Sequence, residues 1–158
     1  IDKIMLEKYF KHGGISTVLL FSSILAIFSL PVFFFIDQTI FNVSGIKILV
    51  LAVVGILNTL ILLFYLIALK SEEASVAVVF YQLVPVFGGI LGYFILGEVL
   101  NQIQILSMII IIFGAIIISF EIDSDNKFKL RKKAIIPMLA AAFCWALGSV
   151  LFKAVALE

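Results

Sequence analysis

Residues 48–69 read ILVLAVVGILNTLILLFYLIAL, a run of 22 residues that contains no charge. As an α-helix rising about 1.5 Å per residue, this run is roughly 33 Å long, which matches a hydrocarbon core about 30 Å thick. A buried strand of a soluble protein needs only about 4 to 8 apolar residues between turn signals. The run therefore predicts a membrane-spanning helix, because a backbone in lipid must satisfy its own hydrogen bonds.

Four more uncharged runs, of 18 to 22 residues each, occupy residues 15–36, 76–96, 103–120 and 134–152. All 21 charged residues of the 158 lie outside the five runs, and the mean hydropathy is +1.29. The links between the runs are short, so consecutive helices are expected to pack as antiparallel neighbours. The sequence thus predicts an all-α fold, a polytopic transmembrane helix bundle with five spanning helices.

The charge balance and the reactive residues exclude several classes of function. A net charge of +1 provides no basic field to recruit nucleic acid, so no nucleic-acid partner is expected. The five apolar runs make the lipid bilayer an expected partner. Cys144 and His12 are single residues of their types and supply neither a disulfide nor a metal-ligand cluster, so no metal and no cofactor are expected. No GxSxG, HExxH or phosphate-cradling motif occurs, and the chain is not expected to be an enzyme.

Asn58 stands at the eleventh position of the 22-residue run, near the predicted midplane of the membrane. An unpaired amide at that depth would cost several kcal/mol, so Asn58 is expected to face the interior of the bundle. Two interpretations stay open, a hydrogen bond that joins helices and the lining of a substrate path. Tyr65 lies two turns further along the same face and is either a second lining residue or an interfacial anchor.

The third run carries Tyr81, Gln82 and Pro85 near its middle. Proline has no N–H to donate and clashes with the preceding turn, so the helix is expected to kink or open locally there. Freed backbone groups are tolerated in a membrane only where protein or a water-filled cavity covers them. This turn is therefore a candidate part of a translocation pathway, although prolines are in any case common in membrane helices.

Three glycines follow in the same run, and one tryptophan lies deep in the last run. Gly88 and Gly92 form a GxxxG step that Gly89 widens, which predicts close helix packing, either within the chain or in a homodimer. Trp145 lies about two-thirds of the way along residues 134–152, deeper than an interfacial belt residue. It is either an aromatic wall of a ligand site or a core aromatic.

Residues 68–120 read ALKSEEASVAVVFYQLVPVFGGILGYFILGEVLNQIQILSMIIIIFGAIIISF. This stretch resembles the EamA-type drug/metabolite transporters, whose repeat unit has an "Al…as" hairpin, a helix with a central proline, a terminal "LgE", a short polar link with "q", and an apolar helix with a late glycine. The corresponding residues are Ala68, Ala74, Ser75, Pro85, Leu96, Gly97, Glu98, Gln104 and Gly114. Order and spacing agree over about 50 residues.

The resemblance implies a ten-helix transporter made of two inverted halves, of which this chain would supply helices two to six. Residues 1–120 would then be the remainder of a first repeat with four spanning helices, residues 121–133 a charged linker, and residues 134–158 the first helix of a second repeat. It further implies secondary, non-ATP transport of small metabolites such as amino acids, by alternating access in a plasma (bacterial inner) membrane. The alternative is a non-transporting membrane scaffold or lipid-handling subunit.

The predicted topology places nine of the eleven cationic side chains on one side of the membrane, with only Lys47 and Lys153 on the other. By the positive-inside rule the linker at 121–133 would face the cytoplasm. The resemblance implies the opposite, because both ends of such transporters usually lie in the cytoplasm. The two orientations remain open.

Overall fold

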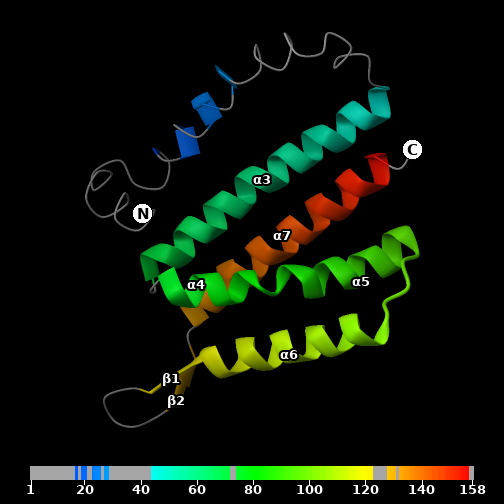
Figure 1. The fold of residues 1–158 in the computed structure, drawn as a ribbon. Coiled ribbons are helices and arrows are strands. Elements are labelled where there is room, and N and C mark those ends of the chain that lie inside the picture. The colour runs from blue at the N-terminus through cyan, green and yellow to red at the C-terminus, as the bar shows by residue number, and fades with distance from the viewer. Residues whose placement is uncertain are drawn as a thin grey trace.

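The computed structural model describes residues 44–71, 74–122, 128–130 and 132–156, together with isolated helical positions between residues 17 and 28. Most of the predicted span at residues 15–36 lies outside the described residues. The elements follow in the order α3 (Gly45–Ser71), α4 (Ala74–Tyr81), α5 (Val84–Leu96), α6 (Gln102–Ile118), β1 (Phe120–Ile122), β2 (Phe128–Leu130) and α7 (Lys132–Ala156) (Figure 1). The all-α polytopic bundle predicted from the sequence is confirmed.

Three helical segments of the described chain are long and apolar enough to cross a membrane: Gly45–Lys70, Ala77–Leu96 and Ile135–Ala156. The predicted span at residues 103–120 forms a shorter helix of 17 residues, α6. At about 1.5 Å per residue it is roughly 25 Å long. It ends early because Ser119 caps it and the chain turns into β1 at Phe120.

The start of α6 is fixed by a capping box. The Asn101 side chain accepts a hydrogen bond from the Gln104 backbone N–H, and the Gln104 side chain accepts one from the Asn101 backbone N–H, both at 2.8 Å. Two of the N–H groups that a helix leaves unpaired at its N-terminus are thereby satisfied. Before this box, Gly97 ends α5 in the left-handed conformation (φ 68°), which favours glycine.

Two short strands, Phe120–Ile122 and Phe128–Leu130, occupy described parts of the linker predicted as a loop at residues 121–133, which corrects the sequence-based expectation. Strands β1 and β2 pair antiparallel, with Phe120 opposite Leu130 and Ile122 opposite Phe128. Both strands, FEI and FKL, alternate apolar and charged residues, the two-residue period of a strand. Helix α7 then begins at Lys132, ahead of the predicted boundary at 134.

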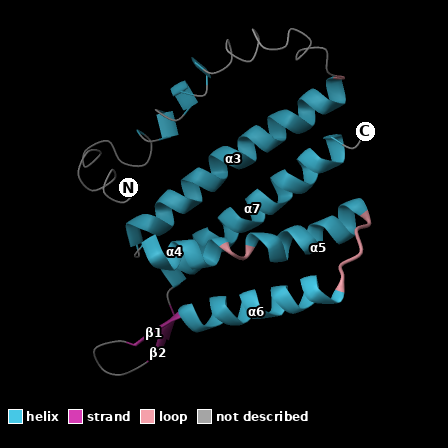
Figure 2. Ribbon diagram, in the orientation of Figure 1, coloured by secondary structure: helices cyan, strands magenta, loops and turns pink. Residues whose placement is uncertain are grey.

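The predicted helix at residues 76–96 is interrupted near its middle, as Pro85 led us to expect. Figure 2 shows a loop between α4 and α5, at Gln82 and Leu83. The N–H groups of these two residues bond to carbonyls three residues earlier, at 3.1 Å each, as in a 3₁₀ turn. Pro85 lies in the first turn of α5, where a missing N–H costs nothing further. The prediction of a kink or local opening is confirmed.

Helix α7 is the centre of the described bundle. It packs most extensively on α3 and also contacts α4 and α5, while α6 lies on the far side of α5 from α3 (Figure 1). The core collects where α3, α4 and α7 meet, around the fully buried Leu69, Phe80 and Met138. This arrangement brings the middle of α3 and the break between α4 and α5 against the same face of α7.

Candidate functional site

Two adjoining cavities follow the contact between α3 and α7 and share one wall. The first, which we name the aromatic cavity, has a volume of about 410 Å³ and is lined by Tyr65, Val78, Tyr81, Gln82 and Trp145. The second, the α3–α7 cavity, has a volume of about 520 Å³ and lies between the Asn58 face of α3 and the Ser149 face of α7. Trp145 lines both cavities and is the wall they share.

Three rings of the aromatic cavity form one contact chain across three helices. The rings of Tyr65 and Tyr81 lie edge to face, with centroids 5.8 Å apart and an interplanar angle of 89°. The ring of Tyr81 contacts that of Trp145 in the same way, at 5.3 Å and 83°. Each such contact contributes about 0.5–1.5 kcal/mol beyond the area it buries. The chain therefore holds Tyr81 between α3 and α7.

Gln82 reaches the aromatic cavity because the helix is broken at that residue. Its side chain is exposed and forms no hydrogen bond with any residue in the described part of the chain. Pro85 has no N–H, so the carbonyl oxygen of Tyr81 lacks the partner that it would have in a continuous helix. The aromatic cavity is thus lined by one unpaired amide, that of Gln82, beside a break in the helix that leaves the Tyr81 carbonyl without its usual helical partner.

Asn58 lies in the middle of α3 and lines the α3–α7 cavity, but it is exposed rather than enclosed, which corrects the expectation that it faces the interior of the bundle. On the opposite helix, Gly148 is buried and would place a Cβ 3.8 Å from the Leu57 side chain, so α7 approaches α3 closely there. The next residue, Ser149, is exposed and lines the cavity. Within the described ranges, no residue donates to or accepts from the Asn58 amide, so this cavity contains an unpaired polar group.

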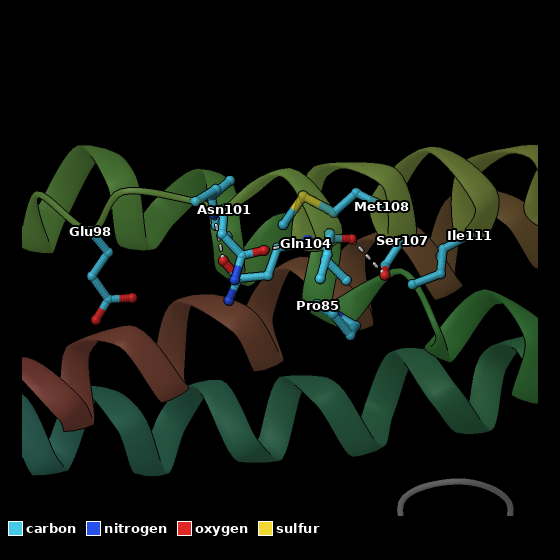
Figure 3. Close-up of a pocket in the computed structure, with 11 residues that line it drawn as sticks. Pro85, Glu98, Asn101, Gln104, Ser107, Met108 and Ile111 are labelled. Carbon is cyan, nitrogen blue, oxygen red and sulfur yellow. Dashed lines mark hydrogen bonds between the residues drawn. The ribbon is translucent and has the colours of Figure 1, made fainter.

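Pro85 lies away from these two cavities. It lines a third one, the α5–α6 cavity of about 400 Å³, with Gly88 and Gly89 (Figure 3). Figure 3 shows the labelled side chains of this cavity from Glu98 at one end to Ile111 at the other. The structure therefore separates Pro85 from the five other residues predicted to line a substrate path. Its local effect is to break the helix so that Gln82 can reach the aromatic cavity.

The three glycines predicted to pack helices have different surroundings. A Cβ at Gly89 would overlap the Met108 side chain of α6, and one at Gly92 would approach a Glu98 carboxylate oxygen to 3.0 Å. A Cβ at Gly88 would meet nothing within 4 Å among the residues that the structure describes. Gly89 and Gly92 therefore permit contacts within the chain, while the side of α5 at Gly88 remains open.

An ion pair that the sequence did not reveal joins the ends of α5 and α7. The Lys153 ammonium donates to the Glu98 carboxylate, and both side chains are about half exposed. At the same end of the bundle, Lys47 of α3 donates to the carbonyl of Val155, at 3.4 Å. These two contacts join the first turn of α3 and the loop after α5 to the last turns of α7.

The structure brings together five of the six residues predicted to line a path, namely Asn58, Tyr65, Tyr81, Gln82 and Trp145. Sequence reasoning missed Ser149 as a lining residue. A signal was available, because Ser149 lies four residues after Trp145 and so on the same face of a helix. What the sequence could not give is which face of α7 meets α3.

The comparison with protein families matches residues 3–120 to the model of the EamA-like transporter family. The match includes α3 to α6, while α7, with Trp145 and Ser149, lies beyond it. No curated protein and no solved structure matches the chain.

Proposed function

The chain belongs to the EamA-like transporter family, and from that premise we propose that it works as a secondary transporter of small metabolites such as amino acids or related compounds. Membership makes it a multi-pass integral membrane protein of the drug/metabolite transporter superfamily. We propose that it needs no ATP, that it alternates access between two helix bundles, and that it resides in the plasma membrane. Catalysis is not part of the proposal.

One observation supports the proposal: the aromatic cavity and the α3–α7 cavity adjoin at Trp145, and each is lined by an exposed amide residue without a hydrogen-bond partner in the described part of the chain, Gln82 in the first and Asn58 in the second. Polar groups in the hydrocarbon region need a partner, and a passing hydrophilic solute or its water can be that partner. The break between α4 and α5 adds an irregular backbone of the kind that builds transporter binding sites. We propose that substrate binds along this Trp145-centred path.

The proposed architecture extends the family match to the rest of the chain. Residues 1–120 would be the remainder of a first repeat with four spanning helices, and residues 121–133 the linker. Residues 134–158 would begin a second, inverted repeat. Substrate would then pass between the two repeats, near the midplane.

The alternative of a non-transporting scaffold, or of a homodimer through the glycine face, has weaker support. Two of the three glycines, Gly89 and Gly92, are used within the chain, which leaves only Gly88 open for a second copy. A scaffold would also have no use for cavities lined by unpaired amides. The path along α3 and α7 favours transport.

The test is uptake of radiolabelled amino acids and related metabolites into proteoliposomes that contain the complete protein and no ATP. We expect uptake, and we expect Asn58→Ala and Gln82→Ala each to lower it about fivefold, the size of one lost hydrogen bond. Gln102→Ala, at an exposed position at the start of α6, is the matched control and should leave uptake unchanged. If Asn58→Ala, Gln82→Ala and Trp145→Ala all left transport unaltered, the site assignment would be wrong.

A further inference from the structure

Ser149 differs from Thr59, Ser107 and Ser119 in how its hydroxyl is used. A serine or threonine in a helix commonly donates to the carbonyl four residues earlier. Thr59, Ser107 and Ser119 do so, with donor–acceptor distances of 3.2, 2.8 and 2.6 Å. The hydroxyl of Ser149 makes no hydrogen bond with any residue of the described segments.

Ser149, whose hydroxyl is unbonded within the described segments, lines the same cavity as Asn58, whose amide is likewise unbonded there. The two come from opposite walls, Ser149 from α7 and Asn58 from the middle of α3. The rest of the lining, such as Leu51, Val54 and Phe152, is apolar, and none of the lining side chains is charged. Polar atoms in such surroundings gain most from a partner that supplies complementary hydrogen bonds.

From this geometry we propose that Ser149 and Asn58 form a polar subsite for an uncharged hydrogen-bonding group of the substrate, such as a hydroxyl or a carboxamide. The inference rests on the proposed transport function and deepens it. A charged group would enter a low-dielectric cavity without a counter-charge, which is costly, while a hydroxyl can both donate to the Asn58 carbonyl and accept from Ser149.

The aromatic cavity would bind the part of the substrate that the polar subsite does not. Its rings and Val78 offer apolar surface on the other side of Trp145, so an apolar portion of the solute is accommodated there. Trp145 contacts both portions, since its side chain lines both cavities. The two cavities therefore fit the side chain of a small solute, with an apolar part and a neutral hydrogen-bonding part, and any charged groups of that solute would lie outside them.

Threonine and valine are the sharpest probes, because they have nearly the same shape and differ by a hydroxyl in place of a methyl. Binding of each to the complete purified protein is measured by isothermal titration calorimetry. We expect threonine to bind about tenfold more tightly than valine, the upper range for one hydrogen bond. In Ser149→Ala this ratio should fall to within about twofold.

The matched control is Ser107→Ala on α6, whose hydroxyl is already bonded to the Ile103 carbonyl and lines the α5–α6 cavity. That variant should keep the threonine preference. A wild-type protein that binds both probes equally, or neither, overturns the subsite, as does a Ser149→Ala variant that retains the preference. Uptake of a wider set of solutes is measured in parallel. If uptake occurs without a threonine preference, the subsite is wrong while the transport function stands, and if both are absent, both proposals are wrong.

Discussion

The α5–α6 cavity and the two cavities along α3 and α7 have similar volumes, but they differ in whether their polar side chains have hydrogen-bond partners. In the α5–α6 cavity the polar side chains have partners within the chain: Asn101 with Gln104, Ser107 with a backbone carbonyl, and Glu98 with Lys153. Along α3 and α7, Asn58, Gln82 and Ser149 have none among the described residues.

This difference favours a structural role for the α5–α6 cavity and a solute-binding role for the two cavities along α3 and α7. In the α5–α6 cavity the paired polar groups have structural roles: they cap the start of α6 and join the loop after α5 to α7. None of these groups needs a ligand as a hydrogen-bond partner. Unpaired polar groups in a membrane protein cost free energy that is recovered only when a solute or water pairs with them. Substitutions in the two regions should therefore alter different measurements, stability in the first and transport in the second.

The largest effect is expected for Trp145→Ala. The substitution removes the shared wall of the two cavities and the contact that holds Tyr81. We expect uptake by proteoliposomes to fall about thirtyfold, equivalent to about 2 kcal/mol of lost solute interaction, as for other central aromatic anchors.

The control for Trp145→Ala is Phe143→Ala, two residues earlier on the same helix. Phe143 is similarly exposed, and its ring contacts Phe87, with centroids 5.8 Å apart, but it lines neither cavity of the path. Uptake by this variant should stay within about twofold of the wild type. Equal losses in both variants would mean that aromatic packing on α7, rather than the path, governs transport.

The next effect concerns stability and tests the other region. In Gly89→Val the new Cβ would overlap the terminal methyl group of Met108 and lie 3.3 Å from a methyl group of Leu100, while in Gly88→Val it meets nothing within 4 Å among the described residues. Because both substitutions change helix propensity equally, their difference isolates the steric term, for which we expect about 1 kcal/mol, the low end for an added side chain, since the flexible Met108 side chain can move. Thermal unfolding in detergent should show a lower midpoint for Gly89→Val. A larger loss at Gly88 would mean that another surface packs on the open side of α5.

Much of this architecture was predictable because it depends on neighbours in the sequence. The lengths of the uncharged runs predict the spans, the missing N–H of Pro85 predicts the break after Tyr81, and the spacing of Asn58 and Tyr65 places both on one face of α3. Each of these inferences uses only a local rule. They were sufficient to select five residues that the structure gathers in two adjoining cavities.

What the sequence did not predict depends on contacts between helices far apart in the chain. The separation of Pro85 from the path follows from the packing of α6 on α5, and the pair of Glu98 and Lys153 joins residues 55 positions apart. The spacing from Trp145 places Ser149 on the same face of α7, but the packing of α7 on α3 is needed to show that this face lines a cavity. The pairing of β1 with β2 is the reverse case, because a local alternation of apolar and charged residues indicates these strands although the lengths of the apolar runs do not.

The smallest effect is expected for the ion pair between Glu98 and Lys153, because both side chains are about half exposed, at 42% and 51%. Exposed pairs of this kind contribute about 0.2–1 kcal/mol. Thermal unfolding of Glu98→Gln, Lys153→Met and the double variant should therefore give a coupling energy within that range, and uptake should be nearly unchanged in all three. The opposite pattern, a tenfold loss of uptake in Glu98→Gln with an unaltered unfolding midpoint, would place this carboxylate in the transport path. The distinction between cavities with paired polar groups and cavities with unpaired ones would then not hold at Glu98.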